Sequence, residues 1–409
     1  MAPIRSRTWV PVALALLAVG WGANQFSPML LVYRAELGLS AGDLALIFSL
    51  YAIGLIPGLL VGGRAADRYG RRRVVLPFVA LSPVASALLI AFHHAPIGLG
   101  VARFLAGACS GVVFAGASAW LLELSEDGPS GTAARRTTIA MTAGFAAGPL
   151  ATALLAQWAP ASLWLPYLPH VALGVLALVA TLRTPETVTA TTRGPLLRLP
   201  STARLPRFRR TIVPMAPWVF GSACLAFVVL PAQVSSAHSH SVAFAGVAAA
   251  MTAGAGVLVQ PLGRRIEDRR PMRAAAVGLA AAVVGVAIGL VAVDAQSKAL
   301  VLAGALPFGA TYGLCLVAGL RETERLSPAH ERAASNALFL TFGYVGFGVP
   351  YAFAGLDQLI GTEAALLLFG AIAALTALAS ASGPQPLGEQ QQPDERLRVV
   401  ACRDRLVQP

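Results

Sequence analysis

Charged residues are scarce in this chain: 12% of its 409 residues are Asp, Glu, Lys or Arg, whereas 56% are hydrophobic. Soluble globular proteins carry about twice that share of charge, roughly 25%. The mean hydropathy, +0.68, is correspondingly high. This composition excludes a water-soluble domain and predicts an all-α membrane protein.

Cysteine is also scarce, so we expect no disulfide framework. The four cysteines are Cys109, Cys224, Cys315 and Cys402. His238 and His240 have no cysteine or acid at ligand spacing, so we predict no metal site. The apolar segments group no paired acids, histidine cluster or nucleophile beside a base. We therefore expect neither an enzyme nor a bound cofactor, and a membrane sensor or membrane-embedded enzyme is an unfavoured alternative.

Long apolar segments recur along nearly the whole chain. They lie near residues 9–33, 43–62, 74–93, 96–121, 136–158, 163–182, 212–235, 242–262, 274–293, 298–320, 333–355 and 362–381. A helix needs roughly 20 residues to cross the hydrocarbon core of a bilayer. The pattern therefore predicts about twelve membrane-spanning helices.

Positive charge is unevenly distributed over the turns between these segments. The formal net charge is +12, and 28 of the 31 Lys and Arg residues fall on one side of the predicted membrane. Arg34 and Lys298 fall on the other side, and Arg103 lies within an apolar segment. The positive-inside rule places both termini in the cytoplasm. Charge sorted in this way argues against nucleic-acid binding. The abundance of Arg and Ala suggests a GC-rich bacterial genome, and we predict a protein of a bacterial cytoplasmic membrane.

The segments fall into two halves. We predict a cytoplasmic N-terminus at 1–8, six-helix bundles at 9–182 and 212–381, a cytoplasmic linker at 183–211 and a disordered cytoplasmic tail at 382–409. A shift of 200 residues carries Gly63-Arg64 onto Gly263-Arg264, and Asp67 onto Glu267. Parallel repeats of this kind indicate an internal duplication.

The turn between the second and third segments carries a recognisable motif. Its spacing is Gly63-x-x-x-Asp67-Arg68-x-Gly70-Arg71-Arg72, within a basic turn of about ten residues. This spacing resembles the loop signature of the major facilitator superfamily, and the resemblance covers about residues 9–381. It implies two six-helix bundles related by a pseudo-two-fold axis, which move a small molecule across the membrane by alternating access.

The resemblance also implies a gating network in this turn. In the family the acidic residue of the motif holds the inner gate, and the basic residue after it bonds an acid at the end of the fourth helix. The matching residues are Asp67, Arg71 and Glu123. We expect Asp67 to pair with a helix N-terminus or a basic group of the other half, with Gly63 and Gly70 permitting the tight turn. Alternatively, the arginines only set the orientation.

Two further motifs resemble the family pattern in part. Arg103 precedes Gly107 and Gly111 at four-residue spacing, as in the motif whose arginine is linked to proton coupling; the alternative is that Arg103 snorkels to the membrane surface. Gly144, Gly148 and Pro149 match the core of an antiporter signature. The two downstream glycines of that signature are missing, which leaves symport as an alternative.

Polar residues within the apolar segments are candidates for the substrate cavity, because such groups face a cavity or bind another helix. Asn24 and Gln25 come first, since the first helix of this fold lines the central cavity. The other candidates are Tyr51, His170, Trp218, Gln233, Tyr312, Asn336 and Tyr344. Helix packing is the alternative role for each of them. Among these residue types, only an unperturbed histidine, such as His170 would be in water, titrates near neutral pH.

Acidic residues are absent from the centres of the cavity-lining segments, and this absence narrows the substrate. Carriers of organic cations often keep an embedded acid, so a small hydrophobic or weakly anionic compound is predicted instead. We predict proton-coupled efflux by a monomer in the lipid bilayer, with Arg103 as the proton-coupling candidate. An uptake symporter or a facilitator for a small metabolite is the alternative.

Overall fold

Each long apolar segment folds as a helix, because in hydrocarbon a helix satisfies all of its backbone amides and carbonyls internally. The computed structural model describes residues 8–125, 132–188, 196–197, 199–234, 241–328 and 331–381, and these ranges contain helices and no strand. Eleven helices in these ranges are long and apolar enough to cross a membrane, and a shorter apolar one covers Leu165–Thr181. The prediction of an all-α protein with about twelve spans is confirmed.

Several expectations fall on residues outside the described ranges. These are the N-terminus up to residue 7, the tail at 382–409, most of 189–198 in the linker, and the pair His238 and His240.

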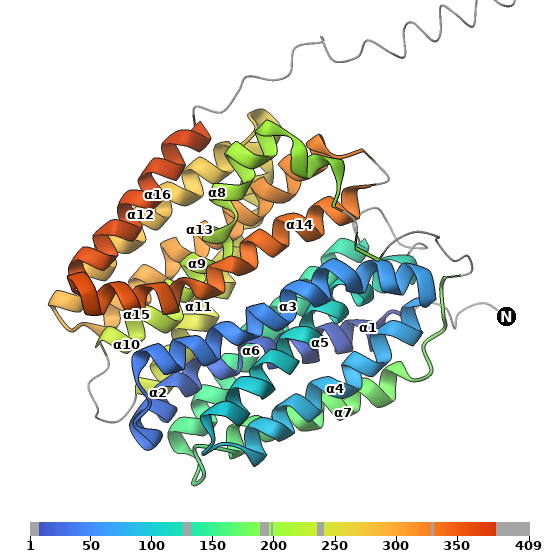
Figure 1. Cartoon of the computed structure of the whole chain (residues 1–409), viewed down its shortest axis with the longest axis horizontal. Coiled ribbons are helices and arrows are strands. Elements are labelled where there is room, and N and C mark those ends of the chain that lie inside the picture. The colour runs from blue at the N-terminus through green and yellow to red at the C-terminus, as the bar shows by residue number, and fades with distance from the viewer. Residues whose placement is uncertain are drawn as a thin grey trace, which may run out of the picture.

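The helices form two bundles that lie side by side (Figure 1). The first contains α1 (Val10–Asn24), α2 (Phe26–Leu37), α3 (Ala41–Tyr69), α4 (Arg71–Ala91), α5 (Pro96–Glu123), α6 (Thr132–Trp158) and α7 (Leu168–Thr181). The second contains α8 (Val213–Met215), α9 (Pro217–Cys224), α10 (Leu230–Val234), α11 (Ser241–Arg269), α12 (Arg273–Asp294), α13 (Lys298–Leu326), α14 (Arg332–Tyr344), α15 (Val349–Ile360) and α16 (Thr362–Ala381).

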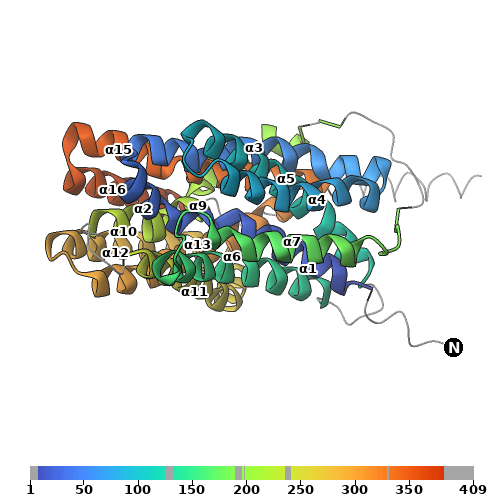
Figure 2. The same ribbon diagram turned by 90° about the horizontal axis from the view of Figure 1, so that it is seen from below.

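Short helices join end to end into single spans. Together α1 and α2 make the first span, and α14 and α15 make the eleventh. The helices α8, α9 and α10 make the seventh with π-helical turns at Phe208–Ile212 and Leu225–Val229. The long axis of both bundles runs the same way (Figure 2). We call the end where α3 and α13 finish the linker end, and the end with α2, α10 and α15 the far end.

Glycines allow helices within each bundle to lie backbone to backbone. A Cβ on Gly107 or Gly111 of α5 would overlap backbone oxygens of α3, at Tyr51 and Leu55. The second bundle repeats this arrangement, because a Cβ on Gly309 of α13 would overlap the carbonyl of Thr252 in α11. Small residues at four-residue spacing permit this approach, and the repetition agrees with the internal duplication.

The predicted basic turn of about ten residues is mostly helix, which corrects the sequence-based prediction. Helix α3 continues through Asp67 to Tyr69, and α4 begins at Arg71. Gly70 alone leaves the helical conformation, with φ of +105°. Ala and Arg are strong helix formers, so the motif extends α3, whereas glycine adopts positive φ at low cost and ends it.

The two bundles touch mainly along α6 with α11, and along α3 with α14 and α15. At the first of these contacts, a Cβ on Gly246 of α11 would overlap the Cβ of Ala153 and lie 3.0 Å from the carbonyl oxygen of Pro149. Gly254 on the same helix has no such neighbour within 4 Å. The close contact between α6 and α11 at this point therefore requires glycine at position 246.

We predict that Gly246→Ala lowers the free energy of unfolding by about 1–3 kcal/mol, the usual cost of overpacking. Gly254→Ala is the matched control and is expected to leave stability unchanged or slightly raised, because Ala is the better helix former. Thermal unfolding in detergent measures both. Equal melting temperatures for the two variants would show that α6 and α11 do not meet here.

Candidate functional site

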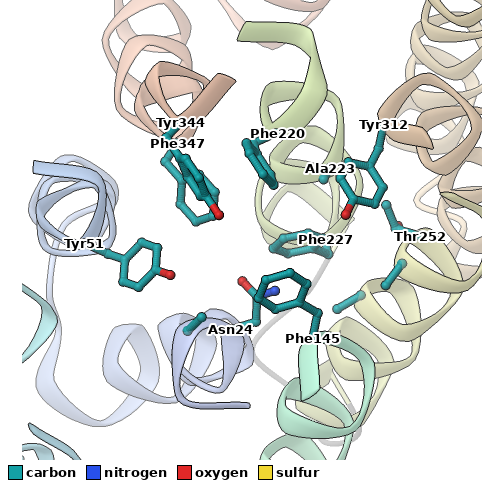
Figure 3. Close-up of a pocket in the computed structure, with 13 residues that line it drawn as sticks. Asn24, Tyr51, Phe145, Phe220, Ala223, Phe227, Thr252, Tyr312, Tyr344 and Phe347 are labelled. Atoms are coloured by element: carbon teal, nitrogen blue, oxygen red, sulfur yellow. The ribbon is translucent and has the colours of Figure 1, made fainter. Parts of the chain in front are cut away.

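The centre of the molecule holds a pocket between the two bundles (Figure 3). Four of the predicted cavity residues line it: Asn24, Tyr51, Tyr312 and Tyr344. They come from α1, α3, α13 and α14, so both bundles contribute. No lining residue is charged. The polar groups offered to a ligand are therefore an amide, phenol hydroxyls and the hydroxyl of Thr252.

Three irregular points in the helices meet at this pocket. Asn24 lies where α1 breaks before α2, Phe227 lies in the π-helical turn Leu225–Val229, and Phe347 lies in the 3-10 turn between α14 and α15. The first break has a local cause: Pro28 lacks the amide that would bond the Asn24 carbonyl, and Ser27 Oγ donates to that oxygen instead, at 2.8 Å. Interrupted helices are common at functional sites.

Aromatic rings form a continuous path across the interface of the bundles. Phe347 stacks on Phe48 of the first bundle with ring centroids 5.3 Å apart, and lies 5.4 Å from Tyr51. On the other side Phe220 lies 5.6 Å from Phe347 and stacks on Tyr344 at 4.2 Å. Offset stacking of this kind is the preferred geometry between aromatic rings. The pocket therefore offers ring faces to a ligand.

The pocket adjoins a larger cavity that extends to the linker end. This cavity has a volume of about 510 Å³ and shares Phe145, Phe220, Tyr312 and Tyr344 with the central pocket. Asn336 lines it, and its buried Oδ1 has no hydrogen-bond partner among the described residues. Ligand pockets commonly measure about 300–1,000 Å³. The cavity has room for a small molecule.

At the mouth of this cavity the structure brings Asp67, Arg71 and Glu123 together. Arg71 is paired with Asp67 on its own bundle, and its Nη2 lies 2.8 Å from Glu123 Oε1. Its Nε also donates to Glu123, at 3.1 Å. Gly63 lines the same cavity. In this conformation Asp67 is held within its own bundle, and the cavity separates it from the second bundle.

Glu186 belongs to this cluster and was not among the predicted residues. Its carboxylate accepts from the backbone amides of Arg71, at 2.8 Å, and Arg72, at 3.0 Å. Glu186 thereby caps the free amides at the N-terminus of α4, where the helix dipole favours a negative charge. A Cβ on Gly70 would lie 2.5 Å from Glu186, which gives Gly70 a second role. The signal in the sequence was an acid directly after a proline at the end of an apolar segment.

The second bundle builds a related cluster with different residues. Glu267 accepts from the amides of Met272 and Ala274, both at 3.0 Å, so it caps α12 as Glu186 caps α4. Arg325 lies 3.1 Å from Glu267 and 3.4 Å from Glu322. In the first bundle the bridging arginine comes from α4, whereas here it comes from α13. The two halves therefore share a cluster of one arginine between two acids, but the arginine lies on a different helix in each half.

Arg103 is fully buried and does not snorkel. Its Nη1 donates to the Ala23 carbonyl at 3.1 Å, and its Nη2 to the Phe48 carbonyl at 3.3 Å. The guanidinium carbon lies 4.6 Å from the Tyr51 ring centre and 4.8 Å from that of Phe26. Cation–π attraction and two carbonyls replace the missing carboxylate partner. Arg103 thus binds the break between α1 and α2 from behind the pocket.

The predicted antiporter residues pack within the first bundle and at its border. Cβ atoms on Gly144 and Gly148 would meet the backbone of α1 at Leu17 and Trp21. Pro149 points its carbonyl toward Gly246 of α11, and α6 runs unbroken through it. Their role in transport remains a prediction.

Several candidates do not reach the pocket. Trp218 is buried in the core of the second bundle. Gln233 lies in a separate small cavity at the far end, 3.4 Å from Asp357. Gln25 and His170 bond to Ser86 within the first bundle. Among the described residues no group of three or more His, Cys, Asp or Glu side chains could hold a metal ion.

Comparison with known proteins identifies the family. The profile of the Major Facilitator Superfamily matches residues 12–350. The chain belongs to the major facilitator superfamily. This transporter shares its fold with the solved structure of a mutant of the nucleoside transporter NupG, with a TM-score of 0.74, 13% identity, and 92% of this chain and 99% of that chain covered. It also shares the fold of a D-xylose-proton symporter, with a TM-score of 0.69, 16% identity, and 94% and 98% covered.

Two curated relatives share shorter stretches of sequence. The multidrug resistance protein MdtL of Klebsiella pneumoniae subsp. pneumoniae is 36% identical over 83 residues, which is 20% of this chain and 21% of that protein. The 3-(3-hydroxy-phenyl)propionate transporter of Escherichia coli K12 is 60% identical over 35 residues, 9% of each chain. The transporter thus matches about a fifth or less of the length of either relative.

We predict that Arg71→Ala lowers the free energy of unfolding by about 1–3 kcal/mol, because Asp67 and Glu123 lose their common partner. These acids are partly exposed, at 39% and 27% of their side chains, so the cost stays below that of a fully buried pair. Arg73→Ala removes the same charge from an exposed neighbour and is the control. Thermal unfolding compares the two.

The pairing with Glu123 has its own test in the double variant. Adding Glu123→Ala to Arg71→Ala should restore part of the lost stability, because one unpaired carboxylate is removed. Additive losses, or equal losses for Arg71→Ala and Arg73→Ala, would contradict the arrangement.

Proposed function

We propose that this transporter exports small aromatic compounds that are uncharged or weakly anionic, in exchange for protons. The observation that carries the proposal is the central pocket, which is lined by aromatic rings and hydroxyls, has no charged side chain, and adjoins a cavity between the bundles. Both bundles contribute to the pocket, so a rocking motion of one against the other would expose it alternately to each side.

The lining favours flat, uncharged rings over cations and sugars. Phe220, Tyr344 and Phe347 offer ring faces, and Phe145 and Phe227 add apolar surface. The polar groups are hydroxyls and one amide, which recognise phenols, carbonyls or amides by hydrogen bonds. A cation would meet no carboxylate in the pocket, and only the ring faces could offset its loss of hydration.

Charge distribution gives the orientation of the cavity, and one relative favours export. The linker end carries the basic residues around Arg71, and under the positive-inside rule this end faces the cytoplasm. The large cavity reaches that end, so this conformation is suited to load cargo from the cytoplasm. The multidrug resistance protein among the relatives agrees with this direction.

The relative named as a hydroxyphenylpropionate transporter supports an aromatic cargo. It also keeps uptake by symport as the second candidate, because the Asp67 cluster and the aromatic pocket serve either direction. Measuring the movement of the compound and of protons in the same experiment decides the direction and the coupling of transport.

The test uses purified transporter in liposomes with an acidic interior. The probe is the amide of 3-(3-hydroxyphenyl)propionate, which is uncharged and does not distribute passively with a pH gradient. Each exchange of an uncharged molecule for a proton moves one charge, so the membrane potential is held at zero with potassium and valinomycin. One-for-one exchange should then accumulate the probe inside about tenfold for each pH unit of gradient, while internal pH rises. Proton and probe moving in the same direction would establish symport, and probe movement without proton flux would establish a facilitator.

A matched pair of variants tests the aromatic site. Phe220→Leu removes a ring that faces the pocket, and Phe369→Leu removes one that pairs with Phe353 away from it. The first should weaken the apparent affinity for the probe by about 2- to 10-fold, the value of one aromatic contact. Equal affinities in both variants would contradict stacking in the pocket.

A further inference from the structure

A buried chain of hydrogen bonds joins the break in the first span to His170. Gln25 Nε2 donates to Ser86 Oγ at 2.6 Å, Ser86 Oγ lies 2.7 Å from His170 Nδ1, and His170 Nε2 lies 3.0 Å from the Ala18 carbonyl oxygen. The three side chains come from the first span, α4 and α7. All are at least 98% buried.

The partners fix the direction of every bond in this chain. A carbonyl only accepts, so Nε2 of His170 carries a hydrogen and donates it to Ala18. The Nδ1 atom of the neutral ring is then an acceptor, and it receives the hydroxyl hydrogen of Ser86. Ser86 in turn accepts from the amide of Gln25. The chain of hydrogen bonds therefore runs from Gln25 through Ser86 to Nδ1 of His170, a basic nitrogen that carries no proton in the neutral ring.

A proton added to Nδ1 reverses this direction. The ring then donates at both nitrogens, so Ser86 must accept from Nδ1 and turn its own hydrogen toward Gln25. Gln25 Oε1 is buried and has no hydrogen-bond partner among the described residues. A turn of the Gln25 amide brings this oxygen to Ser86. A proton bound at His170 thereby changes the orientation of the Gln25 amide. Gln25 is next to Asn24, which lines the central pocket.

The space around the imidazole is shaped to hold it. A Cβ on Gly22 would lie 2.6 Å from His170 Nε2, so only glycine leaves room for the ring against α1. A Cβ on Gly174, one turn along α7, would lie 2.9 Å from Pro83 of α4. The first approach places the His170 ring against α1, and the second holds α7, the helix of His170, close to α4.

Few other ionisable groups face this site. Helix α1 contains none, and those of α4 are Arg71, Arg72 and Arg73 at its linker end. The neighbouring phenols, Tyr33 and Tyr167, bond each other at 2.8 Å. On α5, Arg103 binds the Ala23 carbonyl at the same break. An arginine keeps its proton in proteins, and a phenol ordinarily titrates near pH 10.

We propose that Nδ1 of His170 is the binding site of the coupling proton, and that Ser86 and Gln25 pass its presence to the break beside the substrate pocket. This inference rests on the proposed proton-coupled transport. The spans carry no central carboxylate, since their acids lie near the helix ends, and His170 is the one histidine within a described span. Its neutral and charged forms both have a complete set of hydrogen-bond partners.

The experiment separates exchange from proton-driven accumulation in liposomes, with the amide of 3-(3-hydroxyphenyl)propionate as the probe. Exchange of labelled for unlabelled probe needs no net proton movement, whereas accumulation in acid-loaded liposomes does. His170→Gln should keep exchange within about twofold and lose accumulation and probe-evoked proton flux, a tenfold loss per pH unit of gradient. His93→Gln, in the turn after α4, is the control and should keep both activities.

Each other outcome has a fixed meaning. If His170→Gln keeps accumulation and proton flux, the assignment of His170 is overturned and proton-coupled transport stands. If the unaltered transporter moves the probe without proton flux, both the proposed coupling and this site are overturned. If His170→Gln loses exchange as well, Ser86→Ala decides, since it keeps the imidazole: exchange without accumulation supports the relay, and unimpaired accumulation overturns it.

Discussion

The structure depends on one constraint: within hydrocarbon, a polar group must find its partner inside the protein. Helices satisfy the backbone, and charged side chains gather at the helix ends, where Arg71 with Glu123 and Arg325 with Glu267 close each bundle at the linker end. The exception is Arg103, which two carbonyls and three aromatic rings surround. None of the described residues that line the central pocket is charged, so no ion pair has to break there when the bundles move.

The same constraint gives the interface its chemistry. Contacts between the bundles include glycine against backbone, as at Gly246, ring against ring, as between Phe48 and Phe347, and a few hydrogen bonds, such as that from Ser49 Oγ to the Phe347 carbonyl at 3.0 Å. Such contacts are short-ranged and individually weak, so the bundles can separate on one side while they meet on the other. The irregular helix turns at Asn24, Phe227 and Phe347 place the pocket at the centre of that interface.

The sequence predicted the spans and the family well, because hydropathy and a glycine–aspartate–arginine motif are strong signals. It placed the turn at Gly70 too broadly, because the alanines and arginines of the motif are good helix formers. Polarity proved an incomplete guide to the pocket. It selected Asn24 and Tyr344 but missed Phe220, and it grouped Gln25 with Asn24 although neighbours on a helix point about 100° apart. Glu186 lies far from Arg71 in sequence, so its capping role required the fold.

The most direct test of alternating access measures the distance between the two bundles at the linker end. Spin labels on cysteines at Ser118 of α5 and Ala333 of α14, which line opposite walls of the cavity, report that distance by electron paramagnetic resonance in lipid nanodiscs. We predict two distance populations, with the shorter one enriched when the amide of 3-(3-hydroxyphenyl)propionate is bound and the cavity closes. A single distance, unchanged by the probe and by pH, would contradict transport by rocking of the two bundles.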